Sequence, residues 1–154
     1  MTDVTFGSNT ALTVTNLHSL GDGSYWQSAK IDNGTVKGFW AEVFVTILTT
    51  TTAGSAAGYI ELFHAGSVDA GTDFAGGATG SEGSYANTGN LDINDADVVG
   101  NMACDASETT ARTYRKRFVI HNLSEDFALL IGNQSGTAIG ATVNAVEYRL
   151  HKYA

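Results

Sequence analysis

The sequence predicts an all-β fold, an antiparallel two-sheet sandwich that is jelly-roll-like in its connections. Three observations lead to this prediction. Apolar residues alternate with a period of two in several runs, and no helical pattern of period 3.6 extends beyond two turns. The chain contains 18 Gly and no Pro, so Gly must supply most turns. Roughly eight strand-like runs in this length suit a single domain over residues 1–154.

The first block, residues 1–64, consists of predicted strands joined by short turns. Its strand-like runs are residues 3–6, 10–15, 25–32, 36–52 and 58–64. A Gly-containing turn lies at residues 20–24. The pair Asn33-Gly34 is typical of a type I′ hairpin turn, so we expect a hairpin at that point.

The run at residues 36–52 is the strongest predicted strand. Its odd positions form one apolar face: Phe39, Ala41, Val43, Val45 and Ile47. The other face carries Trp40, Phe44 and Leu48, which make it too apolar to be simply solvated. This face is either a second core layer or an exposed patch that oligomerisation covers. Trp40, Phe44 and Leu48 are therefore candidate contact residues.

The middle block, residues 65–108, differs in kind from its neighbours. It holds eight acidic residues and eight Gly, but no Lys or Arg. Strong periodicity is missing, and strand-rich blocks flank it on both sides. We therefore expect a long Gly/Asp-rich insertion within one domain rather than a linker between two. We call residues 65–108 the acidic excursion.

One stretch of the acidic excursion, "LDINDADVVG" at residues 91–100, resembles a calcium loop. An EF-hand loop needs an oxygen ligand at position 5, Gly at position 6 and Glu at position 12. Counted from Asp92, positions 6 and 12 hold Asp97 and Ala103. Counted from Asp95, position 5 is Val99. The EF-hand pattern fails in both registers, and we predict that folding does not need calcium.

The last block, residues 109–154, returns to strands. On residues 113–121, Tyr114, Lys116, Phe118 and Ile120 share one side. Residues 126–133 are apolar on both sides, which suits a covered central strand. The alternation in residues 138–150 slips near Asn144-Ala145, as a β-bulge would cause.

Arg112, Arg115, Lys116 and Arg117 make up half of the eight Lys and Arg in the chain. On a strand, Arg115 and Arg117 project from one face while Arg112 and Lys116 project from the other. The cluster is either a solvated strand end that balances the acidic excursion within one subunit, or a docking patch for an acidic surface on a partner or a neighbouring copy.

Composition and motifs argue against several classes of function. A net charge of −8 disfavours non-specific nucleic-acid binding, which depends on Lys and Arg. No apolar run approaches a membrane span of about 20 residues, and the start of the chain does not resemble a secretion signal. The four His are scattered, Cys104 lacks a basic neighbour, and no nucleotide or hydrolase motif is present. We predict a non-enzymatic protein without a cofactor.

Two segments resemble small structural proteins of tailed bacteriophages. Residues 16–35, followed by the long apolar strand, resemble their N-terminal half. Residues 118–153 resemble their C-terminal half, with a strand, a polar turn and a closing strand that contains Tyr148-Arg149. The resemblance implies a virion protein, assembled in the host cytoplasm, of the head decoration or cement type. It further implies the major capsid protein and the chain itself, as a homotrimer, as partners, with no nucleic acid or membrane.

A second interpretation is a carbohydrate- or receptor-binding module of a phage fibre or tail. Such a site would use exposed Tyr25, Trp26 or Tyr85. Calcium could then be held by Asp92, Asp95 and Asp97.

Overall fold

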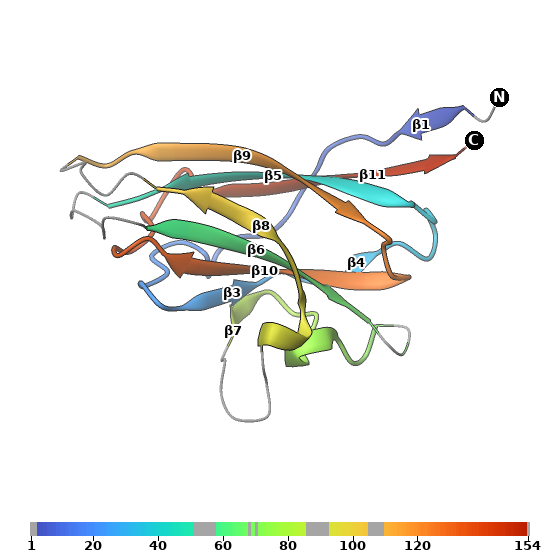
Figure 1. The fold of residues 1–154 in the computed structure, drawn as a ribbon, viewed down its shortest axis with the longest axis horizontal. Coiled ribbons are helices and arrows are strands. Elements are labelled where there is room, and N and C mark those ends of the chain that lie inside the picture. Colours follow the sequence, from blue (N-terminus) through green and yellow to red (C-terminus); the bar gives the residue numbers. More distant parts are fainter. Residues whose placement is uncertain are drawn as a thin grey trace.

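Two antiparallel sheets pack face to face in the computed structural model, which describes residues 3–50, 58–67, 69, 71–85, 93–104 and 110–153 (Figure 1). The first sheet contains, in spatial order, β1 (Val4–Phe6), β11 (Ala145–Tyr153), β5 (Trp40–Leu48) and β9 (Thr113–His121), with β2 (Thr10–Ala11) also on β11. The second contains β7 (Gly83–Tyr85), β3 (Tyr25–Gln27), β10 (Asp126–Gln134), β6 (Tyr59–Gly66) and β8 (Asp97–Ala103), with β4 (Ile31–Asp32) also on β10. The predicted all-β two-sheet sandwich is confirmed.

The strand pairing is nested. β1 pairs with β11, β3 with β10, β5 with β9, and β6 with β8. Successive pairs lie alternately in the first and the second sheet. A long hairpin wound across two sheets produces this order, which is that of a jelly roll.

The main core fills the space between the two sheets. On β5, the residues Ala41, Val43, Val45 and Ile47 are at most 2 % exposed, as the alternation predicts. They meet Phe127, Leu129 and Ile131 of β10. Phe39, expected on the same apolar face, is 57 % exposed because β5 begins only at Trp40.

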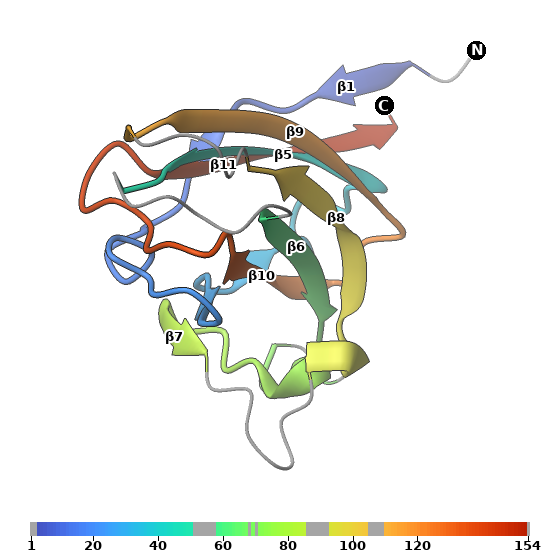
Figure 2. The ribbon, with the colours of Figure 1, turned by 60° about the vertical axis from the view of Figure 1, so that its left-hand side comes forward.

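The acidic excursion covers the other side of the second sheet. Ala128 and Leu130 of β10 point away from the main core and pack with Phe74, Tyr85 and Ile93 in a second core. The 3₁₀ turns η1 (Ala75–Gly77) and η2 (Ile93–Asp95) lie beneath this sheet (Figure 2). β7 and β8, both from the excursion, form the two edges of the sheet. The insertion is therefore part of the domain, and β10 is covered on both sides as predicted.

The expected hairpin at Asn33-Gly34 is wrong. A type I′ turn needs positive φ at both central residues, and neither Asn33 nor Gly34 has it. Instead, β4 lies in the second sheet and β5 in the first, so the segment crosses between sheets. The buried Asn33 amide holds this crossing: its Nδ2 donates to the Gly38 and Ser124 carbonyls, and its Oδ1 accepts from Gly38 N.

The slip at Asn144-Ala145 is also not a β-bulge. It is the start of β11, preceded by Val143 with a φ of 70°. The register shift lies elsewhere, between β6 and β8 at Leu62/Phe63.

Candidate functional site

The outer face of the first sheet carries most of the predicted contact residues. Because Ala41 to Ile47 point into the core, Trp40, Phe44 and Leu48 point outward, where each is half-buried. Residues directly opposite on paired strands project to the same side. Arg117 is opposite Phe44, and Arg115 is opposite Thr46. We define the outer face as the even residues of β5 (Trp40–Leu48) together with the odd residues of β9 (Thr113–His121) and β11 (Ala145–Tyr153).

Glu42 organises the polar part of the outer face, although its carboxylate is largely buried. Its Oε1 lies 2.8 Å from Arg117 Nη1, and its Oε2 lies 3.5 Å from Arg149 Nη1. His151 Nε2 is 3.1 Å from the same Oε2. Arg117 is held in place, yet its side chain remains 61 % exposed. A guanidinium has five donors, so Arg117 can bind a second carboxylate while it contacts Glu42.

Aromatic residues surround the buried imidazole at one end of this face. His151 is fully buried and stacks on Trp40, with ring centroids 3.7 Å apart. Phe6 meets the same imidazole edge-on at 5.2 Å and is itself 67 % exposed. Phe39 and Tyr153 form a neighbouring pair with centroids 4.7 Å apart, and both are more than half exposed. The first sheet thus ends in an exposed aromatic corner.

The basic cluster divides between two environments, as its alternation predicts. The Arg115 side chain makes no hydrogen bond or ion pair within the described part of the chain, although its backbone pairs with Thr46 of β5. Lys116 lies on the other side of β9, where its Nζ donates to the Asn101 carbonyl of β8 and lies 5.2 Å from the centroid of the Phe118 ring. Arg112 precedes β9, and its carbonyl accepts from Thr49 N at 2.9 Å.

A shallow hollow of about 200 Å³ brings predicted aromatic and basic residues together. Phe44, Val45 and Thr46 line it from β5, and Arg115 to Arg117 line it from β9. An apolar surface with adjacent guanidinium groups is the combination that binding hot spots favour.

Acidic and basic surfaces lie on opposite sides of the sandwich. The first sheet is at the top of Figure 1, and the excursion turns are at the bottom. Asp69, Asp73 and Asp95 of the excursion are exposed. Over the residues that the structure describes, Arg115, Lys116 and Arg117 form no ion pair with the excursion. Lys116 contacts the excursion through the Asn101 carbonyl instead.

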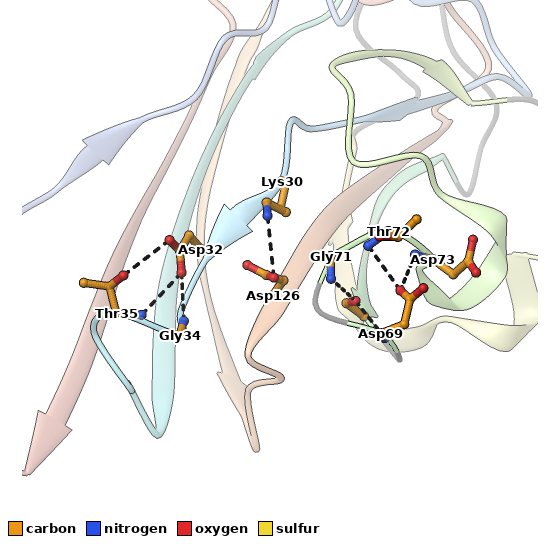
Figure 3. A network of polar contacts seen from close by, with 10 residues as sticks. Lys30, Asp32, Gly34, Thr35, Asp69, Gly71, Thr72, Asp73 and Asp126 are labelled. Atoms are coloured by element: carbon orange, nitrogen blue, oxygen red, sulfur yellow. Dashed lines mark hydrogen bonds and ion pairs between the residues drawn. The ribbon is translucent and has the colours of Figure 1, made fainter.

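Three carboxylates, one in the excursion and two outside it, make local polar contacts (Figure 3). Asp69 Oδ1 accepts from the backbone N of Thr72 at 3.1 Å and of Asp73 at 2.5 Å. Asp32 Oδ1 accepts from Gly34 N at 2.9 Å. The buried Asp126 lies 3.6 Å from Lys30 Nζ. Asp32 and Asp69 therefore bind the backbone of their own turns, and Asp126 pairs with a lysine.

The described residues do not gather the candidate calcium ligands into a metal site. Asp92 lies outside the described residues. Asp97, on β8, has its Oδ2 3.5 Å from His64 Nδ1. Among described residues, no group of three or more His, Cys, Asp or Glu side chains is arranged to hold a metal ion.

The three aromatic residues expected for a carbohydrate site differ in how much of each is exposed. Trp26 is fully buried and its Nε1 donates to Glu82 Oε1 at 2.8 Å, so the expectation of an exposed Trp26 is wrong. Tyr85 is 6 % exposed, so the expectation of an exposed Tyr85 is wrong as well, whereas Tyr25 is half-buried. Both tyrosines line a polar hollow of about 540 Å³. His18 and Ser19, which also line it, were missed because isolated polar loop residues carry no sequence signal.

The single cysteine, Cys104, is a free thiol that is half-buried. Burial raises the pKa of the Cys104 thiol to about 11, so the thiol stays protonated at neutral pH.

No helix of the described residues is long and apolar enough to cross a membrane. No protein-family model matches this chain, and no curated protein matches it. What the outer face offers is contact surface, with apolar and cationic groups side by side.

Proposed function

We propose that this protein is a non-enzymatic decoration protein of a bacteriophage virion, which docks on the outer surface of the head and stabilises it. The observation that carries the proposal is the outer face. Trp40, Phe44 and Leu48 lie outward there, beside Arg115 and Arg117. The second sheet and the described part of the excursion lie on the opposite side of the first sheet.

Apolar contact and charge would contribute differently to docking. Burial of Phe44 and its neighbours would supply affinity, at about 25 cal/mol per Å² of apolar area. Arg115 and Arg117 would steer the protein to an acidic surface and set its register. Each contact can be weak, because many copies on one head act together.

We propose the major capsid protein as the docking partner, and a homotrimer as the assembled form. Each subunit carries a basic outer face and an exposed acidic excursion on opposite sides. Contact between unlike surfaces of identical chains is head-to-tail, and such contacts close into rings when the rotation permits. The same complementarity would order neighbouring subunits around a capsid axis.

Arg115→Glu is the sharpest test of this docking. The Arg115 side chain has no hydrogen-bond or ion-pair partner in the described structure, so its reversal should leave the melting temperature within a few degrees of wild type. We expect attachment to purified heads, measured by co-sedimentation, to fall at least about tenfold. Arg117→Glu is less clean, because it places a second carboxylate beside the buried Glu42.

Lys37→Glu with Lys152→Glu is a matched control. Both lysines are exposed, and the two strand ends beside them lie at the opposite end of the first sheet from Arg115. This variant should attach like wild type. Attachment of Arg115→Glu that equals wild type would reject the charged docking surface. Absence of the protein from purified particles, by mass spectrometry of heads separated from tails, would reject the virion role itself.

A further inference from the structure

A preformed polar hollow of about 540 Å³ lies beside the edge of the second sheet, away from the outer face. The loop that precedes β3 forms one side of it, and β3 with β7 forms the other. Its volume falls within the roughly 300–1,000 Å³ typical of small-molecule sites. The lining is rich in aliphatic hydroxyl groups, from Thr15, Ser19, Ser24 and Ser84.

The loop is anchored on both sides, so the hollow does not depend on a ligand for its shape. Leu17 and Leu20 are buried in the main core. Asn133 of β10 holds the loop backbone: its N donates to the Ser24 carbonyl at 2.9 Å, and its Nδ2 donates to the Leu20 carbonyl at 3.0 Å. Gly23 N donates to the Asn133 carbonyl in turn. Such preorganisation lowers the entropic cost of binding.

Glu82 ties the loop to the excursion. It accepts hydrogen bonds from Asn16 N at 2.8 Å, Asn16 Nδ2 at 2.7 Å and Trp26 Nε1 at 2.8 Å. Burial alone would raise the pKa of Glu82, but the hydrogen bonds from Trp26 and Asn16 outweigh it and lower this pKa. The carboxylate is therefore ionised at neutral pH and is committed to these three donors.

The hydrogen bonds of Asn144 determine which nitrogen of His18 carries the proton. Asn144 Oδ1 accepts from Leu48 N at 2.9 Å, which fixes the orientation of the amide. Its Nδ2 therefore faces His18 Nδ1 at 2.8 Å and donates to it. The neutral imidazole must carry its proton on Nε2. His18 thus contributes a donor of defined position among the residues that line the hollow.

Two tyrosines also line the hollow, of which Tyr25 is half-buried, whereas Tyr85 is 6 % exposed and packs in the second core. Tyr25 and Tyr85 are directly opposite on β3 and β7, with centroids 6.1 Å apart and an interplanar angle of 77°. The Tyr85 hydroxyl donates to the Gly76 carbonyl, and the Tyr25 hydroxyl accepts from Gln134 Nε2 at 3.3 Å. Both rings are held by contacts with their own sheet layer.

We propose that this hollow binds a neutral saccharide unit. The Ser and Thr hydroxyl groups, the imidazole donor and the half-buried Tyr25 match a ligand that has many hydroxyl groups on an apolar ring. Among the described residues, no Lys or Arg lines the hollow, so these residues do not supply the groups that select phosphate or carboxylate ligands. The site uses neither Trp26 nor calcium, and it is independent of docking through the outer face.

Amide chemical-shift titrations with glucose, galactose, mannose and N-acetylglucosamine test the proposal. At least one sugar should bind with a millimolar dissociation constant and shift signals of residues 15–24 and 84–85. Ser84→Phe, on the exposed edge strand β7, should fill the hollow and abolish binding. Tyr25→Ala should weaken binding at least about tenfold, or about 1.4 kcal/mol.

Ser8→Phe is the matched control, because exposed Ser8 lines a different hollow of about 230 Å³. It should bind sugar like wild type. Failure of all four sugars to bind, or unchanged binding by Ser84→Phe, would overturn the proposal. Glucose 6-phosphate provides a further comparison, and tighter binding than glucose would contradict the neutral class. Loss of head attachment in Arg115→Glu with sugar binding retained would show that the two sites are separate.

Discussion

Glu42 shows how one side chain can position several others on an open sheet face. It contacts Arg117 on β9, and Arg149 and the buried His151 on β11; these two strands flank β5. Taking a carboxylate out of water is unfavourable unless cations and donors replace the water. Here two guanidinium groups supply that replacement, and Arg117 is thereby presented to solvent in a fixed position.

We expect Glu42→Gln to lower the free energy of unfolding by about 1–3 kcal/mol. The variant removes the charge that Arg117 and Arg149 share, while both arginines retain access to water. Urea denaturation at neutral pH measures the change. Glu125→Gln, at an exposed glutamate, should change stability by less than about 0.5 kcal/mol. Equal effects of the two substitutions would contradict the role of Glu42.

His64, on β6 beside β8, lies in an environment that resists protonation of its imidazole. His64 is buried, and burial lowers its pKa, although Asp97 on β8 partly opposes this effect. Because the pKa is lower in the folded state, the unfolded chain takes up the proton first as pH falls. The stability linked to His64 is complete above the unfolded value of about 6.5 and is lost below it.

The melting temperature should therefore fall between pH 7.5 and pH 5.5, and His64→Gln should reduce the size of that fall. Calorimetry of both proteins at the two pH values measures the difference. His121→Gln, at an exposed histidine on β9, should leave the fall unchanged. An identical fall in wild type and His64→Gln would show that other groups are responsible.

The two faces of β5 serve different purposes, which substitutions should separate. Ile47 is fully buried between the sheets, so Ile47→Ala should cost about 2–5 kcal/mol of stability. Phe44 is half-buried on the outer face, where Arg149 lies 5.6 Å from its ring centroid. Phe44→Ala should cost less stability but weaken head attachment, which denaturation and co-sedimentation would measure side by side. A greater loss of stability for Phe44→Ala would contradict this division.

At the scale of the whole molecule, exposed carboxylates of the excursion turns and the exposed Arg115 lie on opposite sides of the sandwich. The excursion packs against the second sheet with apolar residues such as Phe74 and Ile93, and exposes Asp69 and Asp95. The outer face exposes Arg115 on the far side. We propose that these two unlike surfaces attract each other in neighbouring copies.

Light scattering at low ionic strength should therefore give three times the chain mass. The trimer should dissociate as salt rises, because exposed charges are screened over about 8–10 Å near physiological ionic strength. Arg115→Glu should dissociate at lower salt than wild type. A monomer mass for wild type at every salt concentration would reject self-association in solution.

Local patterns in the sequence predicted much of the architecture. The alternation on residues 40–48 and 113–121 predicted which side chains face the core, because side-chain direction on a strand depends only on position, whereas Phe39, just before the strand, is exposed. The two-sided apolar run at 126–133 likewise predicted the covered central strand. The same alternation correctly separated Arg115 and Arg117 from Lys116.

Only the tertiary structure decided which distant residues meet. Glu42 and His151 are 109 positions apart, and no local pattern pairs them. Whether Asn33-Gly34 closes a hairpin or crosses between sheets depended on which strand lay beside β4. The sequence suggests an exposed Trp26, whereas in the structure Trp26 is buried and its Nε1 donates to Glu82 of the excursion. Periodicity is a property of neighbours in the chain, whereas burial, ion pairing and the shape of a hollow depend on contacts that form only when the sheets pack.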